Sequence, residues 1–232
     1  CGNRVLRRHR QLSFDQEKRT TEPFGMTPLL PIAIAFLSHT IPTTTRTAVT
    51  SQTARCMSSS SATMDPKYSS LPKLQTPTGE PLPPSSLPSH LSGKRIALYF
   101  SAGWCPMCTS FEPSLLAFRE AVNSPASNAK NDIELIYVPS DRSEEEILKR
   151  TAAMKMLSVP LADGEADRVK ARYKIWSGSE CGKLGTGRRS GVPALVVLDG
   201  QKNGEEMAFL AAESKGAKAL EDWDLEGGAG VW

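Results

Sequence analysis

The sequence predicts an α/β fold with a small mixed β-sheet flanked by helices, and three features indicate it. Two short runs, Arg95–Phe100 and Ile133–Val138, are almost wholly apolar, which is typical of strands buried on both faces of a sheet. Between them one apolar helix face repeats at spacings of four, three and four, formed by Phe111, Leu115, Phe118 and Val122. A strand, a helix and a second strand in this order predict a right-handed crossover between parallel neighbours.

The elements after the second strand continue the alternation. Residues Ser143–Met154 are predicted to form a helix whose first residue is the N-cap, because a serine oxygen can accept from the free N–H groups of a first turn. A shorter helix is expected over Ala166–Tyr173. The run Ala194–Leu198 predicts a third strand and Met207–Ala211 a fourth, and a helix from about Lys215 to Leu225 closes the fold.

The first part of the chain, residues 1–64, reads as a disordered N-terminal targeting segment. Between Thr27 and Met64 there is no acidic residue, whereas Ser and Thr are abundant and Arg46 and Arg55 remain. This composition is typical of transit peptides, so we expect a plastid or mitochondrial protein after removal of the segment. The apolar run Leu29–Leu37, just after the candidate start Met26, is an alternative secretory signal ahead of a transit segment. A tail with no address, and hence a cytoplasmic protein, is the other alternative.

Residues 65–92 are predicted to be a linker between this segment and a domain at residues 93–232. Seven prolines lie among serines and glycines there, namely Pro66, Pro72, Pro77, Pro81, Pro83, Pro84 and Pro88. Proline removes a backbone donor and fixes φ, so such a stretch is not expected to hold regular structure.

Charge and hydropathy exclude two classes of partner. Residues 1–93 hold 10 Lys and Arg against 5 Asp and Glu, whereas residues 94–232 hold 18 against 20. A near-neutral domain without a clustered basic face gives no reason to expect nucleic-acid binding. No apolar run approaches the roughly 18–20 residues that span a bilayer, so we expect no membrane partner for the mature protein.

The candidate chemistry lies in the segment Trp104-Cys105-Pro106-Met107-Cys108. Two cysteines separated by two residues, directly after a buried strand and at the start of a helix, form the pattern of a dithiol redox site. At the helix N-terminus the macrodipole favours the Cys105 thiolate, which makes it the attacking nucleophile. Cys108, one turn later, is assigned the resolving role. Pro106 suits the first helical turn, and Trp104 supplies an apolar wall.

Other uses of a cysteine pair fit less well. A zinc site needs two more ligands, but only Cys181 remains in the domain, and His9, His39 and His90 all precede it. Haem attachment needs a histidine at position 109, which is Thr109. The lack of histidine also argues against a Cys–His nucleophilic enzyme. A structural disulfide stays open, although so small a loop would stabilise little. We therefore expect neither a metal nor an organic cofactor.

The run Tyr99-Phe100-Ser101-Ala102-Gly103-Trp104-Cys105-Pro106-Met107-Cys108 strongly resembles the active-site segment of tryparedoxins and nucleoredoxins, a branch of the thioredoxin superfamily. Pro113 stands where these proteins bend the active-site helix, and Val138–Glu145 and Met154–Leu161 are similar to the segments that follow. The resemblance covers roughly residues 92–225 and implies a thioredoxin-like fold.

The resemblance also implies a cis-proline loop at Gly191-Val192-Pro193. In the family this loop faces the cysteines, so Pro193 and the backbone of Val192 are expected to contact an extended substrate, together with Trp104 and Pro106. An ordinary proline at the first residue of a strand is the alternative.

Two departures from the family pattern bear on mechanism. Most thioredoxins have an aspartate where Tyr99 stands, so the proton acceptor for Cys108 is unassigned. The stretch Ser177–Ser190 is an apparent insertion with Cys181 and with the basic residues Lys183, Arg188 and Arg189. It could bind an acidic partner, but a mobile loop is the favoured interpretation. Cys181 as a third redox thiol is a hypothesis.

Together these observations predict a thiol–disulfide oxidoreductase that reduces protein disulfides through Cys105 and Cys108. Its partners would be protein disulfides and an upstream dithiol donor, and a monomer is expected. The alternatives are a disulfide oxidase or isomerase, which differs only in reduction potential, and a redox-sensing module that holds a partner protein.

Overall fold

The structure is a computed structural model, which describes residues 66–127, 129–226 and 230–232. The predicted targeting segment, residues 1–64, lies outside this part of the chain, so its role stays a prediction. No helix in the described ranges is long and apolar enough to cross a membrane.

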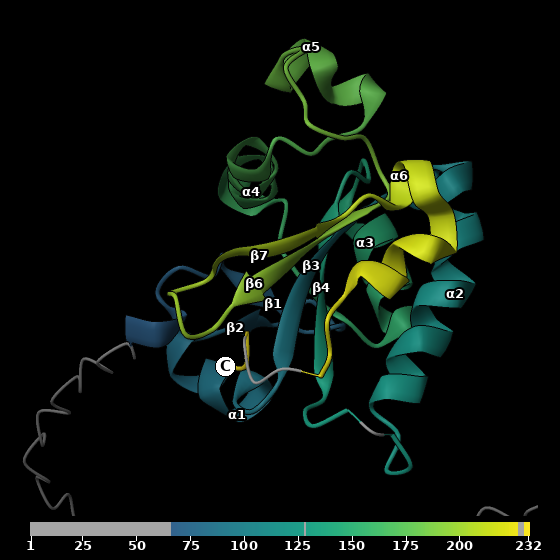
Figure 1. Ribbon diagram of the computed structural model, residues 1–232. Coiled ribbons are helices and arrows are strands. Elements are labelled where there is room, and N and C mark those ends of the chain that lie inside the picture. The colour runs from purple at the N-terminus through teal and green to yellow at the C-terminus, as the bar shows by residue number, and fades with distance from the viewer. Residues whose placement is uncertain (1–65, 128, 227–229) are drawn as a thin grey trace, which may run out of the picture. The chain divides into compact units, whose positions relative to one another are not determined.

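One mixed sheet forms the centre of the fold (Figure 1). Its neighbouring strands are, in order, β2 (Pro81–Leu82), β1 (Leu74–Gln75), β5 (Leu157–Ser158), β4 (Ile133–Pro139), β3 (Arg95–Ser101), β6 (Ala194–Asp199) and β7 (Glu205–Leu210). β3 runs parallel to β4, as the strand–helix–strand order predicts, and antiparallel to β6. The predicted α/β class with a small mixed sheet is confirmed.

Helices cover both faces of the sheet, which explains why the central strands are mostly apolar. Alternate residues of β3 point to opposite sides: Ile96, Leu98 and Phe100 join one core, and Ala97 and Tyr99 join the other. The helices are α1 (Leu87–Leu91), α2 (Pro106–Val122), α3 (Glu144–Met154), α4 (Glu165–Tyr173), α5 (Cys181–Leu184) and α6 (Ala212–Lys215). α2 and α3 pack on one face, and α1 and α4 pack on the other.

Short 3-10 turns connect these elements, at Pro66–Tyr68, Pro84–Ser86, Ala162–Gly164, Gly178–Glu180 and Gly216–Asp222. The last of them corrects a prediction. A helix was expected over Lys215–Leu225, but α6 ends at Lys215 and a 3-10 segment follows. Gly216 adopts a φ of 57°, which an α-helix cannot continue through.

The prediction of a linker at residues 65–92 is wrong for residues 66–92. This segment supplies β1, β2 and α1, and it buries four apolar side chains in the core, namely Tyr68, Leu74, Leu87 and Leu91. Two of its prolines occupy positions that need no N–H: Pro81 lies on the edge strand β2, and Pro88 lies in the first turn of α1. The domain therefore begins before residue 93.

Candidate active site

The junction of β3 and α2 places the two cysteines where the sequence predicts them. β3 ends at Ser101, and Cys105 is the N-cap of α2 with an extended backbone, φ −88° and ψ 115°. Pro106 occupies the first helical turn, where its missing N–H leaves no bond unmade. Cys105 Sγ therefore lies at the end of the helix where free N–H groups point outward and favour negative charge.

The two cysteines differ in access to solvent. Cys105 is 8% exposed and Cys108 is 0% exposed, and both are free thiols. Burial raises the pKa of the Cys108 thiol to about 12; the interaction with the Ser101 hydroxyl opposes this shift and the neighbouring Cys105 adds to it. Only Cys105 is accessible to an incoming disulfide, so solvent access alone indicates that Cys105 reacts first and Cys108 second.

The loop before β6 faces Cys105. The Val192–Pro193 peptide bond is cis, which confirms the expected cis-proline loop. Cys105 Sγ donates to the Val192 carbonyl oxygen at 3.7 Å. Glu213 fixes the loop from behind, since its carboxylate accepts from the Gly191 N–H at 2.6 Å.

Two large apolar side chains next to Cys105 are exposed. Trp104 is 39% exposed and Met107 is 47% exposed. The Trp104 indole N–H donates to the Ser140 carbonyl oxygen at 2.9 Å, and the Arg142 guanidinium lies 5.7 Å from the indole centroid. The ring is thus held in one orientation, and with Met107 and the exposed Pro106 it forms an apolar rim around the Cys105 sulfur.

A buried polar group lies behind Cys108, and the sequence did not reveal it. The Ser101 hydroxyl contacts Cys108, donates to the Tyr99 hydroxyl at 3.0 Å and accepts from Arg150 Nη2 at 3.2 Å. Arg150 also pairs with the Glu112 carboxylate at 2.5 Å. Burial raises the pKa of Tyr99, so its phenol stays protonated. The sequence singled out Tyr99 by its position in the family pattern, and the place of Ser101 at the end of the strand before the cysteines could have suggested it as well.

A second hydrogen-bonded group supports the loop between β3 and α2. Asp141 accepts from the Gly103 N–H at 2.7 Å and from the Tyr137 hydroxyl at 2.5 Å. A Cβ at position 103 would lie 3.3 Å from Asp141 Oδ1 and 3.4 Å from Arg150 Nη1, which is tighter than most Cβ contacts. Glycine therefore lets the loop approach these charged groups closely.

Comparison with known proteins gives the family. Residues 93–206 match the family model described as Thioredoxin-like. Nucleoredoxin of Mus musculus is 32% identical over 114 residues, 49% of this chain and 22% of its own length. Probable nucleoredoxin 1 of Arabidopsis thaliana is 34% identical over 110 residues, 47% of this chain and 16% of its own length. The domain is a member of the thioredoxin superfamily.

Among solved structures, tryparedoxins share a weaker similarity with this chain. Tryparedoxin II of C. fasciculata has a TM-score of 0.47 and 22% identity, over 69% of this chain and 90% of that one. Native tryparedoxin I of Crithidia fasciculata has a TM-score of 0.45 and 25% identity, over 71% and 94%. The chain spans about a fifth of the length of the curated nucleoredoxins that it matches. The family-model match and the nucleoredoxin matches confirm the predicted thioredoxin-like domain.

The insertion in this thioredoxin-like domain, residues 177–190, was expected to be a loop, but its first half contains helical structure. It contains a 3-10 turn and α5, and a capping box joins Ser177 to Glu180. Glu180 also accepts from the Ser140 hydroxyl at 2.7 Å and pairs with the buried Lys170. Because the Ser140 carbonyl holds Trp104, the insertion is anchored beside the active-site rim.

The basic residues of the insertion are paired with carboxylates of the same domain. Lys183 pairs with Asp167, Arg188 with Glu213 and Arg189 with Glu206. They do not form a free cationic surface, so the structure gives no support to an acidic partner here. Cys181 is a partly exposed free thiol at the first position of α5.

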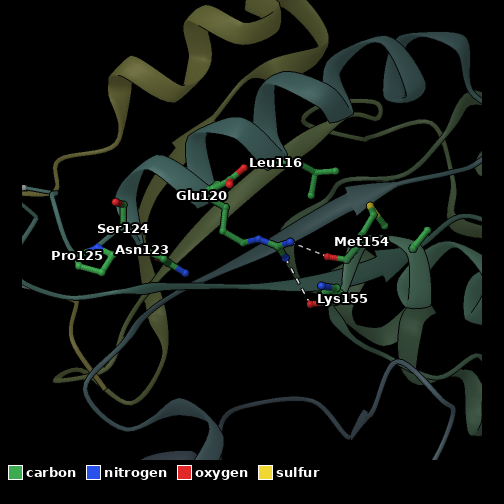
Figure 2. A pocket seen from close by; sticks show the side chains of 9 residues that line it. Leu116, Glu120, Asn123, Ser124, Pro125, Met154 and Lys155 are labelled. Carbon is green, nitrogen blue, oxygen red and sulfur yellow. Dashed lines mark hydrogen bonds between the residues drawn. The ribbon is translucent and has the colours of Figure 1, made fainter.

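A hollow of about 600 Å³ lies between α2 and the C-terminal end of α3 (Figure 2). Arg119 on α2 crosses it and donates to the Met154 and Lys155 carbonyl oxygens, at 2.6 and 3.4 Å. These bonds satisfy carbonyls that the end of a helix leaves free. Arg119 thus joins α2 to α3 at a site without cysteines. Three or more potential metal ligands come together nowhere in the described part of the chain.

Proposed function

We propose that this domain reduces disulfides of other proteins through Cys105 and Cys108, within the thiol oxidoreductase activity of its superfamily. The observation that carries the proposal is the arrangement of one accessible sulfur at the N-terminus of α2, facing the cis-proline loop, with a second, buried sulfur one turn behind it. Its partners are then protein disulfides and an upstream dithiol donor.

The reaction has two exchange steps. The Cys105 thiolate attacks one substrate sulfur, the substrate S–S bond breaks, and the leaving sulfur departs as a thiolate that takes a proton from water. A mixed disulfide now joins Cys105 to the substrate. The Cys108 thiolate attacks Cys105 Sγ and expels the second substrate thiolate. The two thiols have then given two electrons to the substrate and are joined as the Cys105–Cys108 disulfide, which an external dithiol donor reduces again.

The substrate contacts follow from the surface around Cys105. Trp104, Pro106 and Met107 offer apolar area beside the sulfur, and the Val192–Pro193 loop offers backbone groups to an extended segment. When Cys105 loses its proton, the Val192 carbonyl loses the thiol donor that it accepts from in the dithiol state. A substrate backbone N–H can then take that place.

Insulin reduction with a dithiol supply tests the proposal. We expect the wild-type chain to speed precipitation of the insulin B chain, and Cys105→Ser to abolish this effect. Cys108→Ser should be as inactive in turnover but should accumulate a mixed disulfide on Cys105, which mass spectrometry of the acid-quenched protein detects. A Cys108→Ser protein that turns over as wild type, or that never forms the mixed disulfide, would contradict the assigned roles. Cys181→Ser is the matched cysteine control and should retain activity.

The reduction potential of the pair separates the remaining alternatives. Equilibration with glutathione buffers and counting of free thiols by mass gives the value. A potential near about −200 to −270 mV supports a reductase, whereas about −120 to −180 mV indicates an oxidase or isomerase. A reversible couple without turnover of insulin would point to a redox-sensing binding module instead.

A further inference from the structure

Arg150 is a mostly buried charge that the two exchange steps leave without a role. It lies on α3 and its side chain is only 11% exposed. Its Nη2 donates to the Ser101 hydroxyl at 3.2 Å and lies 2.5 Å from Glu112 Oε2, a carboxylate oxygen of α2, in an ion pair. A charge in such a place is costly unless it is paired. The Glu112 carboxylate supplies the pairing, so Ser101 is an additional contact.

Ser101 connects this charge to the resolving sulfur. A hydroxyl has one proton to donate and two lone pairs that accept. Arg150 occupies a lone pair, and the proton lies toward Tyr99 in the dithiol state, while Cys108 contacts the same hydroxyl. When Cys108 loses its proton, the Ser101 proton can turn to the sulfur, and the protonated Tyr99 phenol can donate to Ser101 in return. A guanidinium bound to that oxygen polarises the O–H bond toward the thiolate.

We propose that the Arg150–Glu112 pair, acting through the Ser101 hydroxyl, sets how readily Cys108 forms the thiolate that resolves the mixed disulfide. Arg150 and Glu112 are thus positioning residues with opposite signs: the cation favours the Cys108 thiolate and the carboxylate opposes it. This inference rests on the proposed function and assigns the control of its second step.

The other ionisable groups around this site explain why the pair matters. Cys105 lies on the same end of α2, Tyr99 faces Ser101 from β3, and Tyr137 faces Arg150 from β4 with its ring centroid 5.7 Å from the guanidinium. Asp141, in the loop after β4, bonds the Tyr137 hydroxyl. Burial raises the pKa of both phenols, so neither tyrosine carries charge near neutral pH. Among these described neighbours, Arg150 is the cation, and the carboxylates are those of Glu112 and Asp141.

The resolving step can be timed without any protein substrate. In a full chain whose Cys1, Cys56 and Cys181 are changed to Ser, a small amount of the aryl disulfide DTNB reacts first with Cys105 and releases one coloured thiolate. Cys108 then attacks the Cys105–aryl disulfide, the internal disulfide forms, and a second coloured thiolate leaves; the Cys108 proton goes to the buffer. The rate of this second phase, followed by stopped flow from about pH 6 to about pH 9, reports thiolate formation at Cys108.

Opposite changes are expected from the two members of the pair. Arg150→Met should move the pH profile up by about one unit, because a Ser101 hydroxyl that no cation polarises is a weaker donor to the Cys108 thiolate. At neutral pH the second phase should then slow about threefold, since a tenfold loss of thiolate is partly offset by higher nucleophilicity. Glu112→Gln should move the profile down and speed the phase. A purely structural role would slow both variants.

Ser101→Ala tests the route of the effect. It should slow the second phase, and adding Arg150→Met to it should cause little further change, because Arg150 acts through the hydroxyl that is then missing. If the two substitutions slow the phase independently, the effect does not pass through Ser101 and the inference is wrong.

Arg119→Met is the matched control. Arg119 is another arginine that bonds α2 to α3, but its partners are the Met154 and Lys155 carbonyls at the far end of α3 (Figure 2). Its loss should lower stability and leave the pH profile unchanged. Unshifted profiles in both Arg150→Met and Glu112→Gln would overturn the inference, and Glu112→Gln alone decides it if Arg150→Met does not fold.

This measurement is separate from the test of the proposed function. If the wild-type chain reduces insulin but the pH profiles of Arg150→Met and Glu112→Gln coincide with the wild-type profile, the proposed function stands and the inference is wrong. If the variants shift the pH profile but the wild-type chain reduces no protein disulfide, the proposed function is wrong and the control of Cys108 by the pair stands.

Discussion

Two cysteines three residues apart meet opposite environments, and this difference organises the site. Cys105 lies at a helix end beside the Val192 carbonyl, whereas Cys108 is fully buried and its pKa is raised to about 12. A buried neutral thiol does not compete with Cys105 for substrate. It becomes a nucleophile when the mixed disulfide replaces the Cys105 thiol and Ser101 can donate to the forming thiolate.

The raised pKa of Cys108 predicts a pH-dependent stability. The folded chain holds this proton to about pH 12, whereas the unfolded chain releases it near the ordinary value of 9. The stabilisation is therefore complete below about pH 9 and is lost as pH rises toward 12, by at most about 1.4 kcal/mol per pH unit. Urea unfolding of Cys105→Ser, compared with Cys105→Ser/Cys108→Ser, should show this extra loss in the single variant. If the free energy of unfolding depends on pH in the same way in both variants, Cys108 is not a buried thiol that stays protonated in the folded chain.

At this scale the sequence predicted the local features and missed the tertiary ones. Cys105 and Cys108 could be located because their spacing, the preceding strand and the following helix are contiguous in the chain. Pro193 could be placed only by family resemblance, since its distance to Cys105 depends on how β6 pairs with β3. Arg150 and Glu112 carry no signal of their own, because their role arises where α2 and α3 meet.

Among the elements, the insertion at residues 177–190 is joined to the rest of the domain by buried polar contacts. Lys170 on α4 is 2% exposed and pairs with Glu180 and Asp167, and it also donates to the Pro139 carbonyl oxygen. Burial alone would raise the pKa of Glu180, but hydrogen bonds from Lys170 and Ser140 lower it below its usual range. The carboxylate is thus retained at the junction of the insertion, α4 and the loop that holds Trp104.

Removing this anchor should destabilise the domain. Glu180→Ala leaves a buried ammonium with one fewer carboxylate, and we expect a loss of roughly 3 kcal/mol in the free energy of unfolding. Lys170→Met/Glu180→Leu replaces both charges and should lose less than the single variant. Lys183→Met, which breaks an exposed pair with Asp167, is the control and should leave the denaturation midpoint in place. A Glu180→Ala midpoint equal to that of Lys183→Met would show that the anchor contributes nothing.

Continuous apolar runs and a clear N-cap made the central elements predictable, whereas the peripheral strands are too short to show any pattern. β3, β4, β6 and α3 lie within one or two residues of their predicted ranges, and Ser143 caps α3 by accepting from the Glu146 N–H at 3.3 Å. β1 and β2 have two residues each, too few for a pattern of alternation. They exist because β1 pairs with β5 and its neighbours reach the core.

Across the whole molecule, the segment before residue 93 completes the fold. The ring of Tyr68 lies 5.6 Å from that of Trp232, and Gly93 donates to the Trp232 carbonyl oxygen, so this segment and the last described residues close the same side of the sheet. The core that they share also contains Leu91, Ile96 and Leu198. The site itself lies at the other end of β3, where Ser101 leads to the cysteines.

A chain of residues 93–232 should therefore fail to fold stably, although it contains every residue of the site. It lacks the four buried side chains Tyr68, Leu74, Leu87 and Leu91. At about 1.5–3 kcal/mol each, their loss approaches the roughly 5–15 kcal/mol that holds a domain together. A chain of residues 66–232 keeps every contact that the structure describes and should unfold cooperatively, at the temperature of the same domain in the full chain.

Thermal unfolding followed by circular dichroism compares the two shortened chains. Leu91→Ala in residues 66–232 should fall between them in stability, with a loss of about 2–5 kcal/mol. Equal unfolding temperatures for residues 93–232 and 66–232 would mean that residues 66–92 contribute nothing to the stability of the domain. The prediction of a linker would then be correct.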